Sequence, residues 1–178
     1  INYTGSIRAA NNVDILVNTA KYLDDFQNDR VKILIWGAGD YSEKLCASIN
    51  KLGLKNIVYK GSVKKKYIPS ILVQGDMNVY TFRDGGTKWG ASLNKSFEYM
   101  ASGKPIVGNI DTPYSIVEKF ECGVEKKMDA FELAEVMDKM SKMPKIQYQF
   151  LCDNAKNAVE KYDFSVLAEK VISVVENV

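Results

Sequence analysis

Short hydrophobic runs alternate along the whole chain with segments in which apolar residues recur at helical spacing. The runs are rich in valine, isoleucine and tyrosine and predict strands at 2–5, 31–36, 57–60, 77–82 and 105–108, with a weaker one at 123–124. Between them, the clearest helical patterns lie at 13–23 and 45–52. Runs such as KILIW are apolar on both faces, which is typical of a parallel strand covered by helices on both sides. The alternation therefore predicts an α/β fold with a doubly wound parallel sheet.

The last third of the chain is predicted to be helical. Asp129 and Glu132 have the spacing of a capping pair at a helix start, and Pro144 is expected to stop that helix. Two further helices are expected at 147–161 and 165–176, the second capped by Asp163. Their hydrophobic stripes are interpreted as core packing. Because no linker or internal repeat is evident, residues 1–178 are expected to form a single domain with a helical tail over about 146–178.

Composition narrows the function classes. The 24 Lys and Arg against 22 Asp and Glu give a net charge of +2 over 178 residues, which argues against a strongly basic nucleic-acid-binding protein. Histidine is absent, which removes Ser–His and Cys–His nucleophile pairs and His-ligated metal sites. The three cysteines are far apart and fit neither a disulfide framework nor a zinc site, so a reduced, cytoplasmic compartment is expected.

No run of about 18 apolar residues and no signal-peptide pattern occurs in the sequence. Because the chain opens on Ile1 inside an expected strand, we expect it to begin within a longer gene product.

Three predicted strands end in polar turns that contain glycine, at residues 5–8, 37–40 and 61–63. In an open parallel sheet, ligands bind outside the carboxyl ends of the strands, where glycine lets the backbone approach closely. Three such turns at one edge predict a nucleotide-sized crevice, although each alone is also an ordinary turn. The pair Gly37 and Gly39 is reminiscent of a dinucleotide fingerprint. Ser42 and Lys60 stand where that fingerprint needs a glycine and an acidic residue, which disfavours a nicotinamide dehydrogenase.

The most informative stretch is 85–107, GGTKWGASLNKSFEYMASGKPIV. A glycine loop runs into a helix expected to start near Ser92 or Leu93, and such a helix start suits a phosphate or diphosphate. Lys95 lies in the first turn, where acidic residues are usual, and a bound anion would account for it. Glu98 has the chemistry to accept hydrogen bonds from two ribose hydroxyls. The alternative is that Lys95 and Glu98 form a surface salt bridge.

The same helix is also expected to pack against the sheet. Helical spacing predicts a packing face that consists of Leu93, Phe97, Met100 and Ala101.

Residues 90–105, GASLNKSFEYMASGKP, closely resemble the donor-binding motif of retaining glycosyltransferases of the GT-B, family 4 type. More particularly, the stretch resembles the bacterial branch tied to cell-surface polysaccharide assembly, whose motif reads roughly G-x-S-P-N-K-x-F-E-Y-M-A-x-G-K-P. The resemblance covers most of the chain, but only 94–105 is specific. It implies that the chain is the carboxy-terminal Rossmann-like half of a GT-B fold, which holds a nucleoside diphosphate sugar, and that the amino-terminal acceptor domain is absent from this chain.

The resemblance also implies roles for individual residues. Glu98 would bind the ribose as the second glutamate of an E-x7-E pair, and the backbone at Ser62 and Val63 would meet the base. Lys95 and Arg8 are expected to stabilise charge on the leaving diphosphate, with no nucleophile, metal or cofactor. The remaining residues expected to line the donor are Ser6, Gly37, Gly39, Ser92, Leu93 and Asn94.

Two departures from the family pattern stand out. Gly90 occupies the position of the first glutamate, which usually touches the donor sugar. Ser6 and Asn11 occupy the positions of a frequent basic pair after the first strand, and Arg8 is the nearby cation, unless it is a plain surface arginine.

The lysine run at 64–66, with Lys60 before it, is interpreted as a solvated face rather than a nucleic-acid site. It would also raise the potential near an anionic donor or anionic lipid, so peripheral association of the full-length enzyme with the inner face of the membrane stays an alternative. Two further functions stay open, a sugar-nucleotide epimerase of the same fold and a nucleotide-binding module without catalysis. The isolated chain is expected to be inactive in sugar transfer.

Overall fold

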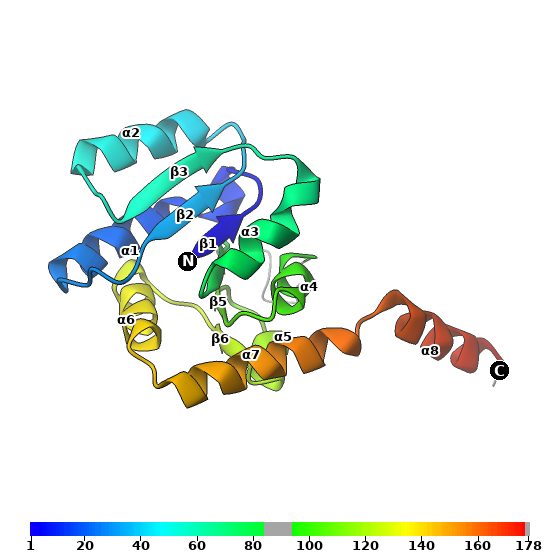
Figure 1. Cartoon of the computed structure of the whole chain (residues 1–178). Coiled ribbons are helices and arrows are strands. Elements are labelled where there is room, and N and C mark those ends of the chain that lie inside the picture. The colour runs from blue at the N-terminus through cyan, green and yellow to red at the C-terminus, as the bar shows by residue number, and fades with distance from the viewer. Residues whose placement is uncertain (84–93, 177–178) are drawn as a thin grey trace.

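A computed structural model describes residues 1–83 and 94–176, and its centre is a six-stranded parallel sheet in the order β3-β2-β1-β4-β5-β6 (Figure 1). All strand pairs are parallel. This arrangement confirms the predicted doubly wound α/β fold. The strands are β1 (Asn2–Thr4), β2 (Ile33–Trp36), β3 (Ile57–Gly61), β4 (Asn78–Thr81), β5 (Ile106–Asn109) and β6 (Gly123–Glu125).

Helices cover both faces of the sheet and form two hydrophobic cores. One core contains buried residues of α1 (Asp14–Asp25), α2 (Ser42–Leu52) and α6 (Ala130–Ser141). The other contains buried residues of α3 (Ile68–Gln74), α4 (Asn94–Ala101), α5 (Ile116–Lys119) and α7 (Lys145–Glu160). Two 3-10 turns, η1 (Ala9–Asn11) and η2 (Lys65–Tyr67), complete the connections after β1 and β3.

Strand β2 is less covered than the sequence predicts. In β2, Ile33 and Ile35 are fully buried, whereas Leu34 and Trp36 are only half-buried. The expectation that KILIW is buried on both faces is therefore wrong. The cause is the strand order, because β2 lies next to the edge strand β3 and its second face borders a groove beside α3.

The predicted helix caps are confirmed. Asp129 Oδ1 accepts hydrogen bonds from the amides of Phe131 and Glu132 at 2.8 and 2.9 Å, and Glu132 Oε2 accepts one from the Asp129 amide at 2.9 Å. Asp163 Oδ1 accepts a hydrogen bond from the Ser165 amide at 2.9 Å, at the start of α8 (Phe164–Glu176).

The stripe of α8 is not packed into a core. None of its described residues is buried, and the helix extends away from the sheet (Figure 1). The interpretation of this stripe as core packing is wrong, because nothing in the described part of the chain covers it. Within residues 1–83 and 94–176, no helix has both the length and the apolar character needed to span a bilayer.

Helix α4 contacts the sheet through a face that matches the prediction only in part, since Met100 is buried as predicted whereas Ala101 is not. Its buried residues are Ser96, Tyr99 and Met100. Ala101 is exposed, and half-buried Phe97 lies with its ring 5.0 Å from the ring of Tyr162. Because α4 also packs along α7, apolar side chains on two sides of the helix have partners, and the single-stripe expectation fails.

Candidate functional site

The strand order reverses between β1 and β4, since the chain continues from β1 toward β2 and from β4 toward β5. At such a switch point a crevice forms outside the carboxyl ends of the strands. The described residues that surround it are the loop after β1, Phe82 and Arg83 after β4, and the start of α4. The predicted site residues Ser92 and Leu93 and the glycine loop before them lie outside the described residues.

Lys95 reaches from the first turn of α4 to the end of β1. Its Nζ lies 3.4 Å from the hydroxyl oxygen of Tyr3 and 4.9 Å from the centre of that ring. The ring centre of Phe82 is 5.5 Å away. A Cβ atom added to Gly5 would lie 2.4 Å from Lys95 Cε, so the stem of the lysine occupies the space that Gly5 leaves open. Gly5 also has a φ of +149°, which disfavours other residues.

Half-burial sets the electrostatics of this lysine. Burial lowers the pKa of Lys95 to about 8, although the charge of Glu98 acts in the opposite direction. In the part of the chain that the structure describes, no ion pair joins Lys95 to Glu98, which disfavours the salt-bridge alternative. Ring faces and a neutral phenol stabilise a cation only partly. The arrangement is suited to receive an anion.

The loop after β1 is held by its own polar side chains. The Tyr3 hydroxyl donates to the carbonyl oxygen of Ser6 at 3.0 Å, and burial raises the pKa of Tyr3. Asn11 Nδ2 donates to the same carbonyl at 2.5 Å and to Ser6 Oγ at 2.9 Å. Ser6 and Asn11, which occupy the positions of the basic pair, are thus hydrogen-bonded to each other. Arg8 is exposed beside η1.

Gly37 and Gly39 let the turn after β2 pack against the turn after β1. A Cβ atom on Gly37 would lie 1.7 Å from the Gly5 carbonyl oxygen, and one on Gly39 would lie 2.1 Å from the Ile7 carbonyl oxygen. The Ile7 amide donates to the carbonyl of Ala38 at 3.0 Å. The two glycines therefore allow the turn after β2 to pack closely against the 5–8 loop and to fix its path.

The residues predicted for the ribose and base lie on α4 and directly after β3. Glu98 is exposed on α4 and lines a hollow of about 190 Å³ between α3 and α4, together with Lys65. Ser62 is exposed and Val63 is half-buried directly after β3. Asn94 is exposed as the first residue of α4. The lysines of the 64–66 run are all exposed, as expected for a solvated face.

Several residues of this region were missed by sequence reasoning. Tyr3 and Phe82 have the pattern of core residues, so their role beside Lys95 has no separate signal. Tyr99 lies outside the predicted packing face of its helix, although its hydroxyl accepts a hydrogen bond from the Thr4 amide at 3.0 Å and so links α4 to β1. Arg83 follows β4 at the crevice edge and lies with Nη2 3.7 Å from Asp14 Oδ2.

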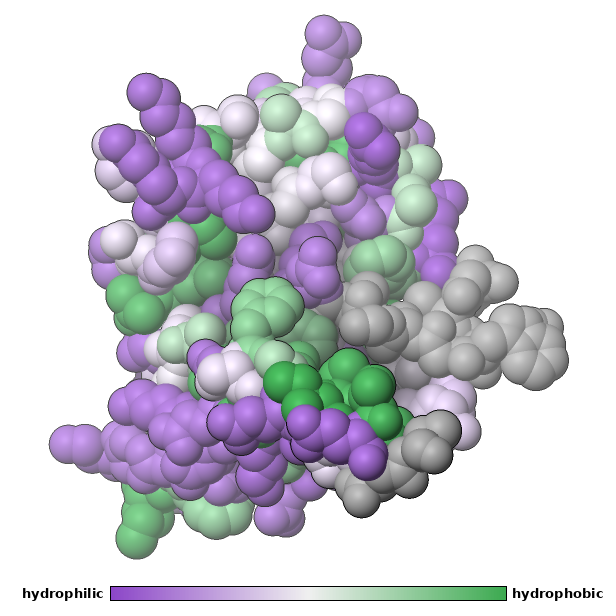
Figure 2. Space-filling view, turned by 90° about the vertical axis from the view of Figure 1, so that its right-hand side faces the viewer, coloured by the Kyte–Doolittle hydropathy of each residue, from purple (hydrophilic) through white to green (hydrophobic). Residues whose placement is uncertain are grey.

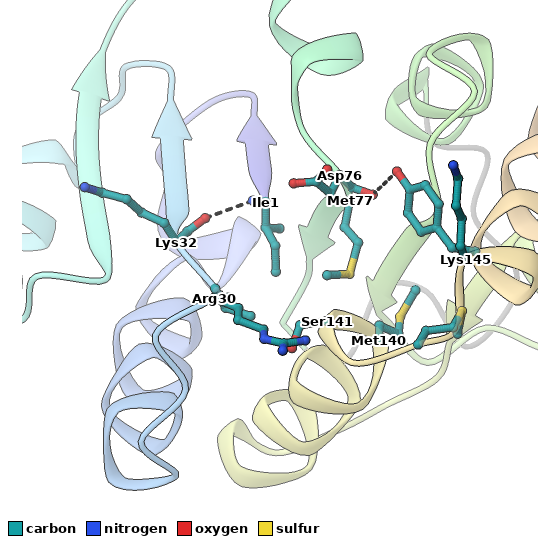
Figure 3. Close-up of a pocket in the computed structure, with 11 residues that line it drawn as sticks. Ile1, Arg30, Lys32, Asp76, Met77, Met140, Ser141 and Lys145 are labelled. Atoms are coloured by element: carbon teal, nitrogen blue, oxygen red, sulfur yellow. Dashed lines mark hydrogen bonds between the residues drawn. The ribbon is translucent and has the colours of Figure 1, made fainter.

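A second cavity, of about 380 Å³, lies at the amino-terminal ends of the strands, on the side of the sheet opposite the crevice (Figure 3). The Ile1 nitrogen donates to the Lys32 carbonyl at 2.8 Å there, and the Tyr148 hydroxyl donates to the Asp76 carbonyl at 3.0 Å. The side chains of Lys32 and Lys145 point away from each other (Figure 3). These two lysines therefore do not converge on one point.

The family model described as "Glycosyl transferases group 1" matches residues 1–142. Curated proteins gave no match.

Solved structures match almost the whole chain. HepE from Anabaena in complex with UDP has a TM-score of 0.79 at 17% identity, covering 99% of this chain and 48% of that one. S. aureus TarM, as a mutant in complex with fondaparinux, alpha-GlcNAc-glycerol and UDP, has a TM-score of 0.76 at 19% identity, covering 97% and 34%. WaaG, a glycosyltransferase involved in lipopolysaccharide biosynthesis, has a TM-score of 0.74 at 17% identity, covering 97% and 46%. The chain has the fold of one half of a GT-B protein and spans between 34% and 48% of these three chains.

Proposed function

Because the chain belongs to the family of group 1 glycosyl transferases, we propose that it is the carboxy-terminal, donor-binding domain of a retaining glycosyltransferase of the GT-B, family 4 type. The full enzyme would transfer a sugar from a nucleoside diphosphate sugar to an acceptor in glycan or polysaccharide synthesis. One observation carries the proposal. Lys95 is a half-buried cation without a carboxylate partner among the described residues, and it lies at the switch point where an open parallel sheet binds its ligand.

The diphosphate of the donor would lie against Lys95 and the start of α4. The first turn of α4 contains no acidic residue, and its backbone amides have no partner within the helix. Glu98, one turn further on, would accept hydrogen bonds from the ribose hydroxyls. The backbone at Ser62 and Val63 would contact the base. The other residues proposed to line the donor are Ser6, Arg8, Gly37, Gly39, Ser92, Leu93 and Asn94.

Catalysis in the full enzyme would rest on positioning and on charge stabilisation, without a metal or another cofactor. As the bond to the sugar breaks, negative charge develops on the diphosphate, and Lys95 and Arg8 would stabilise it. A pKa of about 8 keeps Lys95 mainly protonated at neutral pH. A bound diphosphate would raise that pKa and favour the cation further.

A second domain is part of the proposal. The matched structures are more than twice as long as the part of them that this chain covers, which supports an amino-terminal acceptor domain outside this chain. Exposed apolar residues of α8, such as Phe164 at 89% and Val175 at 69% exposure, support a contact surface for it. The side of the molecule from which α8 projects shows hydrophobic residues beside hydrophilic ones (Figure 2). We place the full enzyme in the cytoplasm, at the inner face of the membrane, with the lysines at 64–66 toward anionic lipid.

Calorimetric titration with UDP, GDP and ADP, each beside its nucleoside, tests the donor-site proposal. UDP is the first choice, because the HepE and TarM structures contain it. We expect at least one diphosphate to bind more tightly than its nucleoside. Equal affinities within every pair would contradict the proposal.

A nucleotide-binding module without catalysis is the second candidate, and Gly90 in place of the first family glutamate favours it. Sugar transfer by the full-length protein would exclude this second candidate. The family match favours transfer over epimerisation.

A further inference from the structure

A buried polar row crosses three strands directly beneath α4. Tyr80 on β4 pairs in register with Gly108 on β5, which pairs in register with Glu125 on β6. A Cβ atom on Gly108 would lie 2.8 Å from Tyr80 Cε2 and 2.9 Å from Glu125 Cγ. Because glycine leaves this space open, the two side chains meet above β5, and the Tyr80 hydroxyl donates a hydrogen bond to Glu125 Oε1.

The row continues into the first turn of α4. Ser96 Oγ donates to the Tyr80 hydroxyl oxygen at 3.2 Å, and Ser96 is only 2% exposed. Because the Tyr80 hydroxyl donates its hydrogen to Glu125, the lone pairs of its oxygen are free to accept the hydrogen bond from Ser96 Oγ. Burial and the charge of Glu125 raise the pKa of Tyr80, so it stays a neutral donor.

Burial of a carboxylate at the position of Glu125 lowers the stability of the fold unless its hydrogen bonds are made. Glu125 is 6% exposed. An apolar residue on β6 would avoid this cost. What Glu125 provides that an apolar residue cannot is a fixed orientation for the Tyr80 hydroxyl.

We propose that Tyr80, oriented by Glu125, is a positioning residue that fixes the first turn of α4. Ser96 is the neighbour of Lys95, so the same turn carries the cation and the backbone amides that the proposed function assigns to the diphosphate. The inference rests on that proposed function for its ligand and on the hydrogen-bonded row for its geometry.

Three variants separate positioning from general stability. Tyr80→Phe keeps the ring against Tyr99, at 5.9 Å between ring centres, and removes the hydroxyl. Ser96→Ala removes only the link to α4. Tyr148→Phe is the matched control, because its hydroxyl also donates to a protein oxygen but lies at the opposite edge of the sheet.

Hydrogen exchange provides a readout without ligand. The amides of Glu98 and Tyr99 close the first turn by donating to carbonyls four residues back. We expect Tyr80→Phe and Ser96→Ala to accelerate their exchange by about threefold or more, and Tyr148→Phe to leave it unchanged. Equal exchange in all three variants and the wild type would overturn the inference, whatever happens to the melting temperature.

Ligand affinity is the second readout. We expect Tyr80→Phe to weaken UDP binding by roughly three- to tenfold and to leave uridine binding unchanged, where tenfold corresponds to 1.4 kcal/mol. Glu125→Gln keeps an acceptor oxygen and should bind UDP more tightly than Glu125→Leu. If uridine and UDP lose affinity equally, Tyr80 does not position the diphosphate site. A wild type that binds no nucleoside diphosphate contradicts the proposed function, and the exchange comparison then decides the positioning role alone.

Discussion

Replacing Lys95 by methionine should separate stability from ligand binding. Methionine keeps an unbranched side chain against Gly5 and the ring of Tyr3, and it removes the charge. The pKa of Lys95 falls from its ordinary value of 10.5 to about 8, which means that burial disfavours the cation in the folded protein. Each pKa unit corresponds to 1.36 kcal/mol, so removal of the charge should stabilise the unliganded protein by at most about 3 kcal/mol.

The same substitution should weaken the diphosphate contact. Loss of one hydrogen bond to a charged partner costs about 1.5 to 3 kcal/mol, which corresponds to roughly 10- to 150-fold in affinity. Urea unfolding measures the first effect, and calorimetry with UDP and uridine measures the second. Lys51→Met, on the exposed face of α2, is the control and should change neither quantity.

The expected result is a Lys95→Met protein that is at least as stable as the wild type and binds UDP at least tenfold more weakly, with uridine affinity unchanged. A clearly less stable variant would show that the ammonium group stabilises the fold, so that Lys95 would be structural. Unchanged affinity for UDP would place the diphosphate elsewhere.

Three further predictions follow from the same geometry. Glu98→Ala should weaken the binding of both UDP and uridine by about 1.5 to 3 kcal/mol, and the protein should stay folded because Glu98 is exposed on α4. An unchanged uridine affinity in calorimetry would show that Glu98 does not bind the ribose. UDP affinity should fall about tenfold between pH 7 and 9, because Lys95 loses its proton as the pH rises through about 8, and in Lys95→Met this fall should be absent. Gly5→Ala should destabilise the protein by about 1 to 3 kcal/mol and also weaken UDP, because the added methyl group displaces Lys95. Gly53→Ala, where φ is +61° and the space is open, should cost stability alone, and equal UDP affinities in the two variants would contradict this account of Gly5.

The sheet could be predicted because its signal is local. Every predicted strand exists, and the caps at Asp129 and Asp163 lie where short-range spacing places them. The helices α3 and α5 were missed, because seven and four residues are too few for a helical period to emerge. The exposed stripe of α8 was misread for another reason, since periodicity identifies an apolar face without showing what covers it.

The candidate site was only partly accessible to sequence reasoning. The placement of Lys95 at a helix start could be read from its neighbours, but its burial against Tyr3 depends on contacts between residues 92 positions apart. The hydrogen bond between Tyr80 and Glu125 joins residues 45 positions apart across a third strand. Neither pair has a local signature, because tyrosine in a strand and glutamate near a turn are ordinary residues in those positions.

An NMR titration of the labelled chain with UDP tests the central claim most directly. The account predicts that amide shifts concentrate in residues 5–8, in 62–63 and in the first turns of α4, including Lys95 and Glu98. Shifts gathered instead around Ile1 and Asp76, at the opposite edge of the sheet, or no shifts with any of the three diphosphates, would contradict it.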